Sequence, residues 1–262
     1  MANQGIAMQV LAILQARFNS TRLPGKVLKP ILGKAMLAQQ VERLQQVKSV
    51  DKLIIATSSQ ASDDVIEQLC QKLAVNCYRG SLDDVLDRYY QASKNHQAQH
   101  IVRITGDCPL IDIDIVEQVV NMHTTSNFDY TSNIQPATFP DGLDVEIFKF
   151  SALEKAWLGA NKPSEREHVT LYIRNNPDLY NCQNFTHTKD LSHLRWTVDE
   201  PEDFDFVTKV YQALYQKKPF FNYSDIISLL IEQPHLQTIN QKYIRNEGLL
   251  KSQAQDKELG YE

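Results

Sequence analysis

Apolar runs and amphipathic stretches alternate along the chain as far as residue 123. The short aliphatic runs that are typical of buried strands lie at 9–16, 52–58, 75–78 and 100–105. Helical periodicity, with apolar side chains three or four positions apart, lies at 36–47, 63–74, 83–96 and 113–123. A helix between two strands makes the crossover that parallel pairing needs. The pattern therefore predicts an α/β fold with a mostly parallel central sheet and helices on both faces.

The rhythm changes near residue 128. DYTSN (129–133) and the alternating LDVEIF (143–148) predict antiparallel strands, or a small antiparallel arm, over about 128–150. The elements expected after this region are a strand at 194–198 and helices at 151–159, 164–175, 202–215 and 223–232. We expect one domain over 1–233, followed by a polar tail over 234–262.

Composition narrows the class of protein. Hydrophobic residues make up 42% of the 262 positions, enough for a packed core, and a net charge of -5 argues against nucleic acid or an anionic membrane as partner. No Lys or Arg precedes the first apolar run, and Gln9 and Gln15 interrupt it, so it indicates a strand rather than a signal peptide. No run has the length of a membrane span. The four cysteines lie far apart without metal-binding spacing, which favours a cytoplasmic protein with reduced thiols.

The segment after the first strand is basic, although the net charge of the whole chain is negative. No Asp or Glu occurs before Glu42, and the segment carries five cations, Arg17, Arg22, Lys26, Lys29 and Lys34. Guanidinium and ammonium groups bind phosphate oxygens, so the segment predicts a polyphosphate site, with a solvated basic loop as the alternative. Neither GxxxxGK[ST] nor GxGxxG occurs in the chain, which argues against a P-loop hydrolase and a dinucleotide oxidoreductase.

Two acidic residues that follow expected strands are candidates for a magnesium site. Asp107 ends the run VRITGD, and Asp199 ends LRWTVD just before a helix start at Pro201. Ligands of an open parallel sheet bind outside the carboxyl ends of its strands, and Mg²⁺ takes one or two carboxylates plus substrate phosphates. A plain turn residue is the alternative for Asp107. Asp112 and Asp114 match the DxD of glycosyltransferases, but we interpret them as a helix N-cap and first turn.

Together, QARFNSTRLPGK, TGDCPLID and TVDEPEDF resemble the cytidylyltransferases that activate acidic sugars. That group includes the 3-deoxy-manno-octulosonate and acylneuraminate enzymes, and the similarity points to the SpsF-type branch of spore-coat polysaccharide biosynthesis. Further matches to that branch are GSLDDVLDRY (80–89), DYTSN, DGLDVEIF (141–148) and EREHVT (165–170). The resemblance covers roughly residues 9–215.

The resemblance implies a Rossmann-like, GT-A-type fold that uses Mg²⁺ and takes CTP and an acidic sugar. The products are a CMP-sugar, for surface polysaccharide or glycan biosynthesis, and pyrophosphate. It also implies a homodimer paired around residues 130–150. By motif matching, Asp107 and Asp199 are the magnesium ligands, and the nucleotide-binding residues are Gln15 and Ala16 at the cytosine and Arg17, Ser20, Arg22 and Lys26 at the triphosphate. Asn19 stands where the family loop usually carries Gly, and Asn also tolerates a left-handed backbone.

The sequence indicates the residues that would bind the acceptor sugar less clearly than the nucleotide-binding residues. Asp144 and Glu146 share one face of an expected strand and are candidates to bind acceptor hydroxyls. Ser164 and Glu167 have the spacing of a capping box, which leaves Glu165 and His168 as candidate acceptor contacts. Arg103 is open between a nucleotide contact and an ion pair with an acid.

The expected reaction is attack of an acceptor hydroxyl on the α-phosphate of CTP. Lys26, Arg17 and Arg22 are then the catalytic cations that stabilise the departing pyrophosphate. A sugar-1-phosphate nucleotidyltransferase is an alternative, although its glycine-rich GxGxR loop is missing. A GT-A glycosyltransferase would use Asp112 and Asp114 as its metal ligands. A catalytically silent nucleotide-binding scaffold would need neither that pair nor Asp107 and Asp199. The sequence does not identify the acceptor sugar.

Overall fold

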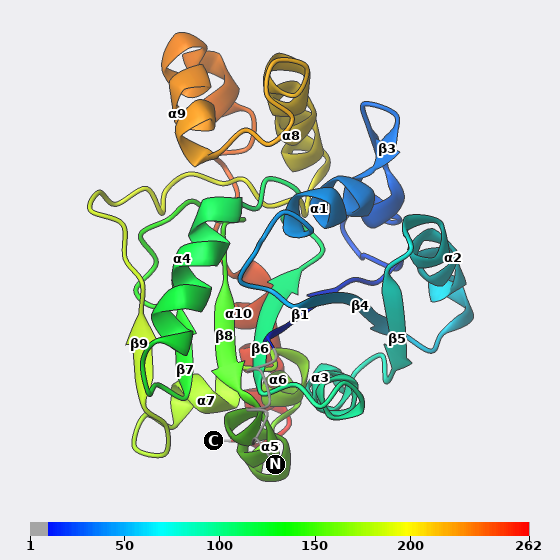
Figure 1. Ribbon diagram of the computed structural model, residues 1–262, viewed down its shortest axis with the longest axis vertical. Coiled ribbons are helices and arrows are strands. Elements are labelled where there is room, and N and C mark those ends of the chain that lie inside the picture. The colour runs from blue at the N-terminus through cyan, green and yellow to red at the C-terminus, as the bar shows by residue number, and fades with distance from the viewer. Residues whose placement is uncertain (1–9, 262) are drawn as a thin grey trace, which may run out of the picture.

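The computed structural model describes residues 10–261 and contains a seven-stranded central sheet of order β5-β4-β1-β6-β8-β7-β9 (Figure 1). Its strands are β1 (Val10–Gln15), β4 (Lys52–Ser58), β5 (Asn76–Gly80), β6 (His100–Thr105), β7 (Tyr130–Ser132), β8 (Glu146–Lys149) and β9 (Cys182–Asn184). β1 pairs in parallel with β4 and β6, and β4 with β5. β8 is antiparallel to β6 and β7, and β9 is parallel to β7. The predicted α/β fold with a mostly parallel sheet is confirmed.

Helices cover both faces of the sheet. They are α1 (Met36–Leu44), α2 (Asp64–Leu73), α3 (Val85–Asn95), α4 (Ile113–Thr124), α5 (Phe150–Gly159), α6 (Pro163–Glu167), α7 (Leu171–Asn175), α8 (Pro201–Leu214), α9 (Tyr223–Glu232) and α10 (Glu247–Glu258), with 3₁₀ turns η1 (Lys26–Leu28), η2 (Ala61–Asp63) and η3 (Pro234–Thr238). Along β1, Leu11 and Ile13 join the buried cluster of α3 and α5, whereas Ala12 and Leu14 join that of α1, α4 and α8. This alternation follows from the two-residue repeat of a strand.

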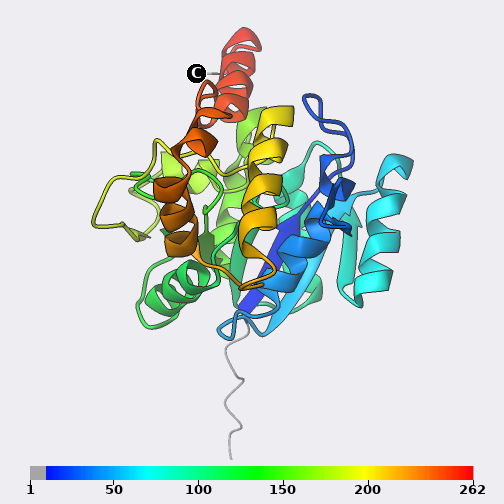
Figure 2. The ribbon, with the colours of Figure 1, turned by 90° about the horizontal axis from the view of Figure 1, so that it is seen from above.

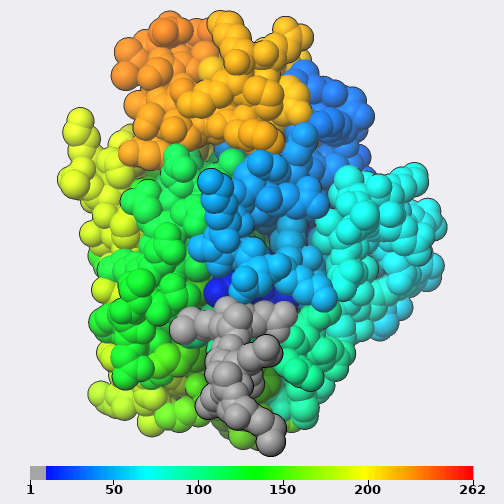
Figure 3. Space-filling model, in the orientation of Figure 1, coloured from blue at the N-terminus to red at the C-terminus, as the bar shows by residue number. Residues whose placement is uncertain are grey.

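Different helices cover the two faces of the sheet. Side chains of α1 and α4 cover the sheet in the space-filling view (Figure 3). Figure 2 shows α10, in red, on the opposite side of the sheet from α4. No helix in the described range 10–261 combines the length and the apolar character of a membrane span.

The segment 128–150 supplies the predicted antiparallel strands, and these are β7 and β8 of the central sheet. A separate small antiparallel sheet, β2 (Pro30–Ile31) with β3 (Lys34–Ala35), follows the basic loop instead. Gln9, the first residue of the strand predicted at 9–16, lies outside the described residues.

Two predicted elements are wrong. The strand at 194–198 is an extended segment with one isolated bridge, between Arg195 and Asp141, because its later backbone N–H, that of Val198, bonds to Asp107 in a different loop. The helix at 164–175 is interrupted by Val169, whose φ of 50° is left-handed, so α6 ends before it and α7 begins after it.

The polar tail packs on the body of the protein. Asp256 of α10 accepts hydrogen bonds from the backbone N–H and the hydroxyl of Ser164 in α6. The predicted capping box of Ser164 and Glu167 is therefore wrong, because the Ser164 hydroxyl is committed to the tail. Glu262, the last residue of the predicted tail, lies outside the described residues.

Candidate active site

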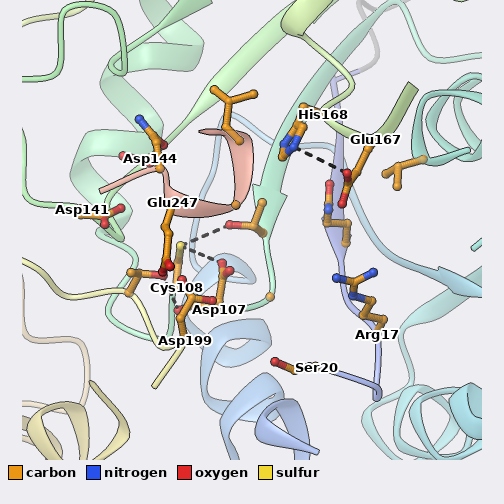
Figure 4. Close-up of a pocket in the computed structure, with 18 of the residues that line it drawn as sticks. Arg17, Ser20, Asp107, Cys108, Asp141, Asp144, Glu167, His168, Asp199 and Glu247 are labelled. Carbon is orange, nitrogen blue, oxygen red and sulfur yellow. Dashed lines mark hydrogen bonds and ion pairs between the residues drawn. The ribbon is translucent and has the colours of Figure 1, made fainter. Parts of the chain in front are cut away.

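A cavity of about 330 Å³ opens at the carboxyl edge of β1 and β6. Its walls are the loops after these two strands, the α6–α7 region and the segment that leads into α10. Figure 4 shows Asp107, Asp199 and Glu247 on one side and Arg17 across from them. The predicted site residues that line it are Gln15, Ala16, Arg17, Ser20, Arg22, Lys26, Arg103, Asp107, Asp144, Glu146, His168 and Asp199. Glu165 is buried in α6 and is absent from this lining, so its predicted contact with an acceptor has no support.

The loop after β1 is shaped by a buried acid and a glycine. Asp63 accepts a hydrogen bond of 2.7 Å from the backbone N–H of Phe18, and the N–H of Gly25 donates to the Phe18 carbonyl at 3.0 Å. Gly25 has a φ of 69° and caps η1, so Lys26 enters the cavity from the first residue of that turn. Asn19 is not among the described non-glycine residues with positive φ, so the loop does not need the family's glycine there.

Lys26 lies between the two predicted metal ligands. Its Nζ is 2.9 Å from Asp199 Oδ1 and 3.6 Å from Asp107 Oδ2, and it donates to the Val198 carbonyl at 2.7 Å. Burial alone would lower the pKa of Lys26, but the carboxylates of Asp107 and Asp199 outweigh it and raise the pKa. The ammonium is therefore a permanent charge in the cavity.

Close backbone approach brings the two aspartates together. The N–H of Gly106 donates to the Gln15 carbonyl at 2.8 Å, and a Cβ on Gly106 would lie 2.9 Å from that oxygen, so a larger residue would push β6 away from β1. The N–H of Val198 donates to the Asp107 carbonyl at 2.8 Å. This bond sets Asp199 beside Asp107 although no regular strand precedes it.

Arg22 is held by acids from two distant segments. Its guanidinium is 3.0 Å from Asp199, 3.4 Å from Glu200 and 2.7 Å from Glu247. Glu247 begins α10, so the tail supplies a counter-charge to the predicted triphosphate loop. Sequence reasoning missed this contact, because the tail carries no motif.

Arg195, which sequence reasoning also missed, forms an ion pair with Asp199 and with two neighbouring acids. It contacts Asp203 at 2.8 Å, Asp141 at 3.2 Å and Asp199 at 3.4 Å. Asp203 also accepts hydrogen bonds from the backbone of Asp199 and Glu200 and completes the capping box of α8. The spacing of four between Arg195 and Asp199 gave no signal, because it brings side chains together in a helix and this segment is extended.

A second acidic pair lies beside Asp107. Burial and the neighbouring carboxylate of Asp144 raise the pKa of Asp141 to about 7. Burial also raises the pKa of Asp144, which is ion-paired with Arg245. Arg245 comes from the segment before α10, so a second tail residue neutralises acids of the cavity.

Arg103 forms an ion pair in this structure. It is opposite Glu146 in the register of β6 and β8, and its guanidinium donates to the Glu146 carboxylate. Glu146 also accepts hydrogen bonds from the hydroxyls of Tyr130 and Thr170. Because its oxygens are occupied, Glu146 orients Arg103, and an acceptor would have to compete with three donors for the same carboxylate.

His168 and Glu167 lie at the α6–α7 turn and face the cavity (Figure 4). His168 Nε2 is 3.0 Å from the hydroxyl of Ser252 in α10, and that hydroxyl donates to Glu167 at 2.7 Å. Burial lowers the pKa of His168 to about 4 although Glu167 opposes the shift. His168 is therefore neutral near pH 7.

Asp112 serves the fold rather than the cavity. It is fully buried, accepts the N–H of Ile115 as the N-cap of α4, and accepts the N–H of Tyr223 at 2.6 Å. Asp114 is in the first turn of α4. The predicted helix start is confirmed, and neither residue lines the cavity. Within residues 10–261 no cluster of three or more His, Cys, Asp or Glu side chains is arranged to hold a metal ion.

Comparison with known proteins shows the family of this chain. The family model described as cytidylyltransferase matches residues 11–244. The chain is 39% identical over 237 residues to uncharacterized protein MJ1063 of Methanocaldococcus jannaschii, covering 89% of this chain and 95% of that protein. It is 35% identical over 240 residues to the spore coat polysaccharide biosynthesis protein SpsF of Bacillus subtilis, covering 87% and 97%.

A solved structure shares the fold as well. A cytidylyltransferase from Leptospira borgpetersenii superposes with a TM-score of 0.86 at 32% identity, covering 91% of this chain and all of that one. The family match spans the triphosphate loop, Asp107 and Asp199, and it confirms the resemblance drawn from the motifs. The chain belongs to the cytidylyltransferase family of enzymes.

Proposed function

We propose that this enzyme transfers CMP from CTP to an acidic sugar with Mg²⁺ and releases pyrophosphate, for the synthesis of a surface polysaccharide or glycan. The observation that carries the proposal is the contact of Lys26 with both Asp107 and Asp199 inside a cavity bordered by Arg17 and Arg22. The name of the SpsF relative supports a role in polysaccharide synthesis.

The residues present fit a magnesium ion. Lys26 Nζ, a single cation, lies within 4 Å of both Asp107 and Asp199, so the two carboxylates can share one positive centre. Mg²⁺ commonly takes one or two carboxylates and completes its shell with water and substrate phosphates, which suits a pair rather than a larger cluster. When bound, the ion would neutralise phosphate charge and align the triphosphate.

The reaction needs positioning and charge neutralisation from this chain. An acceptor hydroxyl oxygen forms a bond to the α-phosphorus of CTP and gives up its proton to water. The bond from that phosphorus to the bridging oxygen breaks, and pyrophosphate leaves with that electron pair. Lys26, Arg17 and Arg22 would hold the negative charge that grows on the leaving group. Asp144 and His168 line the same cavity and are the residues that would contact the acceptor.

The rivals make different demands on the same fold. A GT-A glycosyltransferase would need Asp112 and Asp114 as metal ligands, but Asp112 is fully buried and bonded to two backbone N–H groups. A sugar-1-phosphate nucleotidyltransferase differs from our proposal in its acceptor, which carries a phosphate instead of an attacking hydroxyl. A silent scaffold would not release pyrophosphate.

Pyrophosphate release tests the proposal. The purified enzyme would be assayed with Mg²⁺, each of the four nucleoside triphosphates, and a panel that contains acidic sugars and sugar 1-phosphates. We expect release with CTP and an acidic sugar. Release with sugar 1-phosphates alone would assign the second class, and no release with any of the four triphosphates would contradict a nucleotidyltransferase.

The proposal includes a cytoplasmic homodimer without nucleic-acid or membrane partners. In this structure the strands of the predicted dimer region, β7 and β8, pair within the central sheet, so a contact around 130–150 would have to use the connection between them. Light scattering coupled to size-exclusion chromatography measures the mass in solution, and a single species of 30.0 kDa would contradict the dimer.

A further inference from the structure

Arg88 is a buried cation that the predicted site did not include. It lies in α3, is 3% exposed, and lines the cavity beside Leu82 and Val85. Its Nη1 donates to the Ser81 carbonyl at 2.8 Å. Its Nε is buried without a hydrogen-bond partner, and no ion pair to Arg88 exists in the described part of the chain. A buried charge without a counter-charge is costly, so this arrangement calls for an explanation.

The acids nearest to Arg88 are already committed. Asp84 accepts from Arg166 Nε at 3.0 Å and caps α3 by accepting from the N–H of Asp87. Asp63 accepts from the backbone N–H of Phe18, the hydroxyl of Thr57 and Ser58. Neither carboxylate makes an ion pair with Arg88 in this structure, so the guanidinium has no protein partner of opposite charge to complete it.

A second cation lies close by. Arg17, at the exit of β1, is exposed, lines the same cavity, and takes part in no ion pair or hydrogen bond among residues 10–261. Burial lowers the pKa of Arg88, and the charge of Arg17 lowers that pKa further, so the two guanidinium groups repel each other. By contrast, Arg22 and Lys26 are neutralised by Asp199 and its neighbours.

We propose that Arg88 and Arg17 together form an anion site that binds the phosphate chain of the nucleotide. An oxyanion between them would supply the missing counter-charge and replace repulsion by charge-assisted hydrogen bonds from the two guanidinium groups. The identity of the nucleotide rests on the proposed function, whereas the anion site needs only a phosphate group. Arg88 is then a binding residue contributed by α3, outside the loop that carries the other cations.

An anion site and a structural arginine predict opposite effects on stability. Arg88→Gln removes an uncompensated buried charge and keeps an amide that can donate to the Ser81 carbonyl. If Arg88 serves an anion, the variant without added ligand should unfold at the same temperature as the natural protein or at a higher one. If Arg88 holds the fold together, that temperature should fall.

Calorimetric titration of Arg88→Gln, Arg88→Lys and Lys94→Gln tests the site, with inorganic tripolyphosphate, CTP plus Mg²⁺, and cytidine as probes. Lys94 is in the same helix and contacts the ring of Tyr90, so Lys94→Gln is a control for the loss of one positive charge. For Arg88→Gln we expect about 10- to 100-fold weaker binding of tripolyphosphate and CTP and unchanged binding of cytidine, as for a lost charged hydrogen bond. Arg88→Lys should recover part of the loss, and Lys94→Gln should bind like the natural protein.

Three results would overturn the anion site: phosphate affinities of Arg88→Gln within twofold of the natural protein, an equal loss for cytidine, or a natural protein that binds neither tripolyphosphate nor CTP. A natural protein that binds tripolyphosphate through Arg88 but does not prefer CTP would instead refute the proposed function and leave the anion site standing.

Discussion

At the scale of single residues, Asp199 is the acid of the cavity that gathers cations from several parts of the chain. Asp199 alone contacts Lys26, Arg22 and Arg195. Burial would raise the pKa of Asp199, but Lys26 and Arg22 reverse this effect and lower it, so the carboxylate stays ionised. An ionised carboxylate is the form that a magnesium ion requires.

The first prediction concerns this pair. Asp107→Asn and Asp199→Asn each remove one negative charge while keeping the side-chain shape. Both variants should lose pyrophosphate release by about 100-fold or more and need more Mg²⁺ for their residual activity. Magnesium titrations of the assay, with folding checked by circular dichroism, provide the measurement.

Asp112→Asn and Asp114→Asn are the matched controls. Asn is as good an N-cap as Asp, so Asp112→Asn should keep the start of α4, but its NH₂ cannot accept the N–H of Tyr223 and the variant should lose some stability. Asp114→Asn should change little because that side chain does not line the cavity. Loss of activity in Asp114→Asn together with full activity in Asp199→Asn would show that our proposal assigns the metal to the wrong pair of aspartates.

The second prediction concerns the protonation of His168. Burial lowers the pKa of His168 from 6.5 to about 4, so between these pH values the unfolded chain binds more protons than the folded protein. Stability from this group is therefore complete above pH 6.5 and is lost as the pH falls toward 4. Between pH 7 and pH 5 the loss should be about 2 kcal/mol.

Urea unfolding at pH 7 and pH 5 measures this effect. His168→Gln should lose about 2 kcal/mol less than the natural protein between the two pH values, whatever its stability at pH 7. His193→Gln, at an exposed position, should keep the full pH dependence. An unchanged pH dependence in His168→Gln would show that this side chain is not buried as a neutral group.

At the scale of elements, short pieces of irregular backbone place the functional groups. The turn at Val169 separates α6 from α7 and sets the hydroxyl of Thr170 on Glu146, which in turn orients Arg103. The tail reaches the same cavity, because Asp256 anchors α10 to Ser164 and carries Glu247 to Arg22.

The third prediction follows from the contact between Glu247 and Arg22. In this structure a carboxylate occupies the guanidinium that a triphosphate would bind, so the two anions compete. Glu247→Gln should bind CTP with Mg²⁺ about 2- to 5-fold more tightly, the range expected for removing one partly exposed ion pair. Calorimetric titration gives the affinity directly.

Glu258→Gln is the control, since Glu258 is exposed at the far end of the same helix. It changes the net charge equally and should leave the affinity for CTP unchanged. Weaker binding in Glu247→Gln would mean that Glu247 assists the nucleotide instead of competing with it.

At the scale of the whole molecule, the sheet order places every functional segment at one edge. β1 is central, with β4 and β6 on its two sides, so the loops after β1 and β6 meet at the carboxyl edge. This is the edge at which open α/β sheets bind ligands. The antiparallel β8 adds Glu146 beside Arg103 and extends the site toward α6 and α7.

The fourth prediction concerns the base. A ligand that binds the folded state raises the unfolding temperature according to its affinity. CTP with Mg²⁺ should therefore raise it more than ATP, GTP or UTP at the same concentration, by thermal-shift measurement. Equal shifts for all four nucleotides would contradict the assignment of a cytidylyl donor.

Much of the fold and part of the site follow from local sequence. The alternating strands and helices up to residue 123, the N-cap of α4 and the basic loop depend on side chains within a few positions of one another, which is why periodicity and motif spacing predict them. Asp107 was likewise predicted at a strand end, because Gly106-Asp107 directly follows β6.

Contacts between distant segments were decided by the tertiary structure. Asp199 follows no strand. It is set beside Asp107 by hydrogen bonds that the N–H of Val198, 91 positions along the chain, and the hydroxyl of Thr197 donate to the Asp107 carbonyl. Arg195 and Glu247 lie in no matched motif, and Arg88 lies in the matched segment 80–89 without an assigned role. Each reaches the cavity only because its element packs there. Periodicity reports which face of an element is buried, but not which other element covers it. The sequence by itself thus determined the α/β frame, the family and the cations after β1, whereas packing between remote segments decided which of those cations are neutralised and which remain open to a ligand.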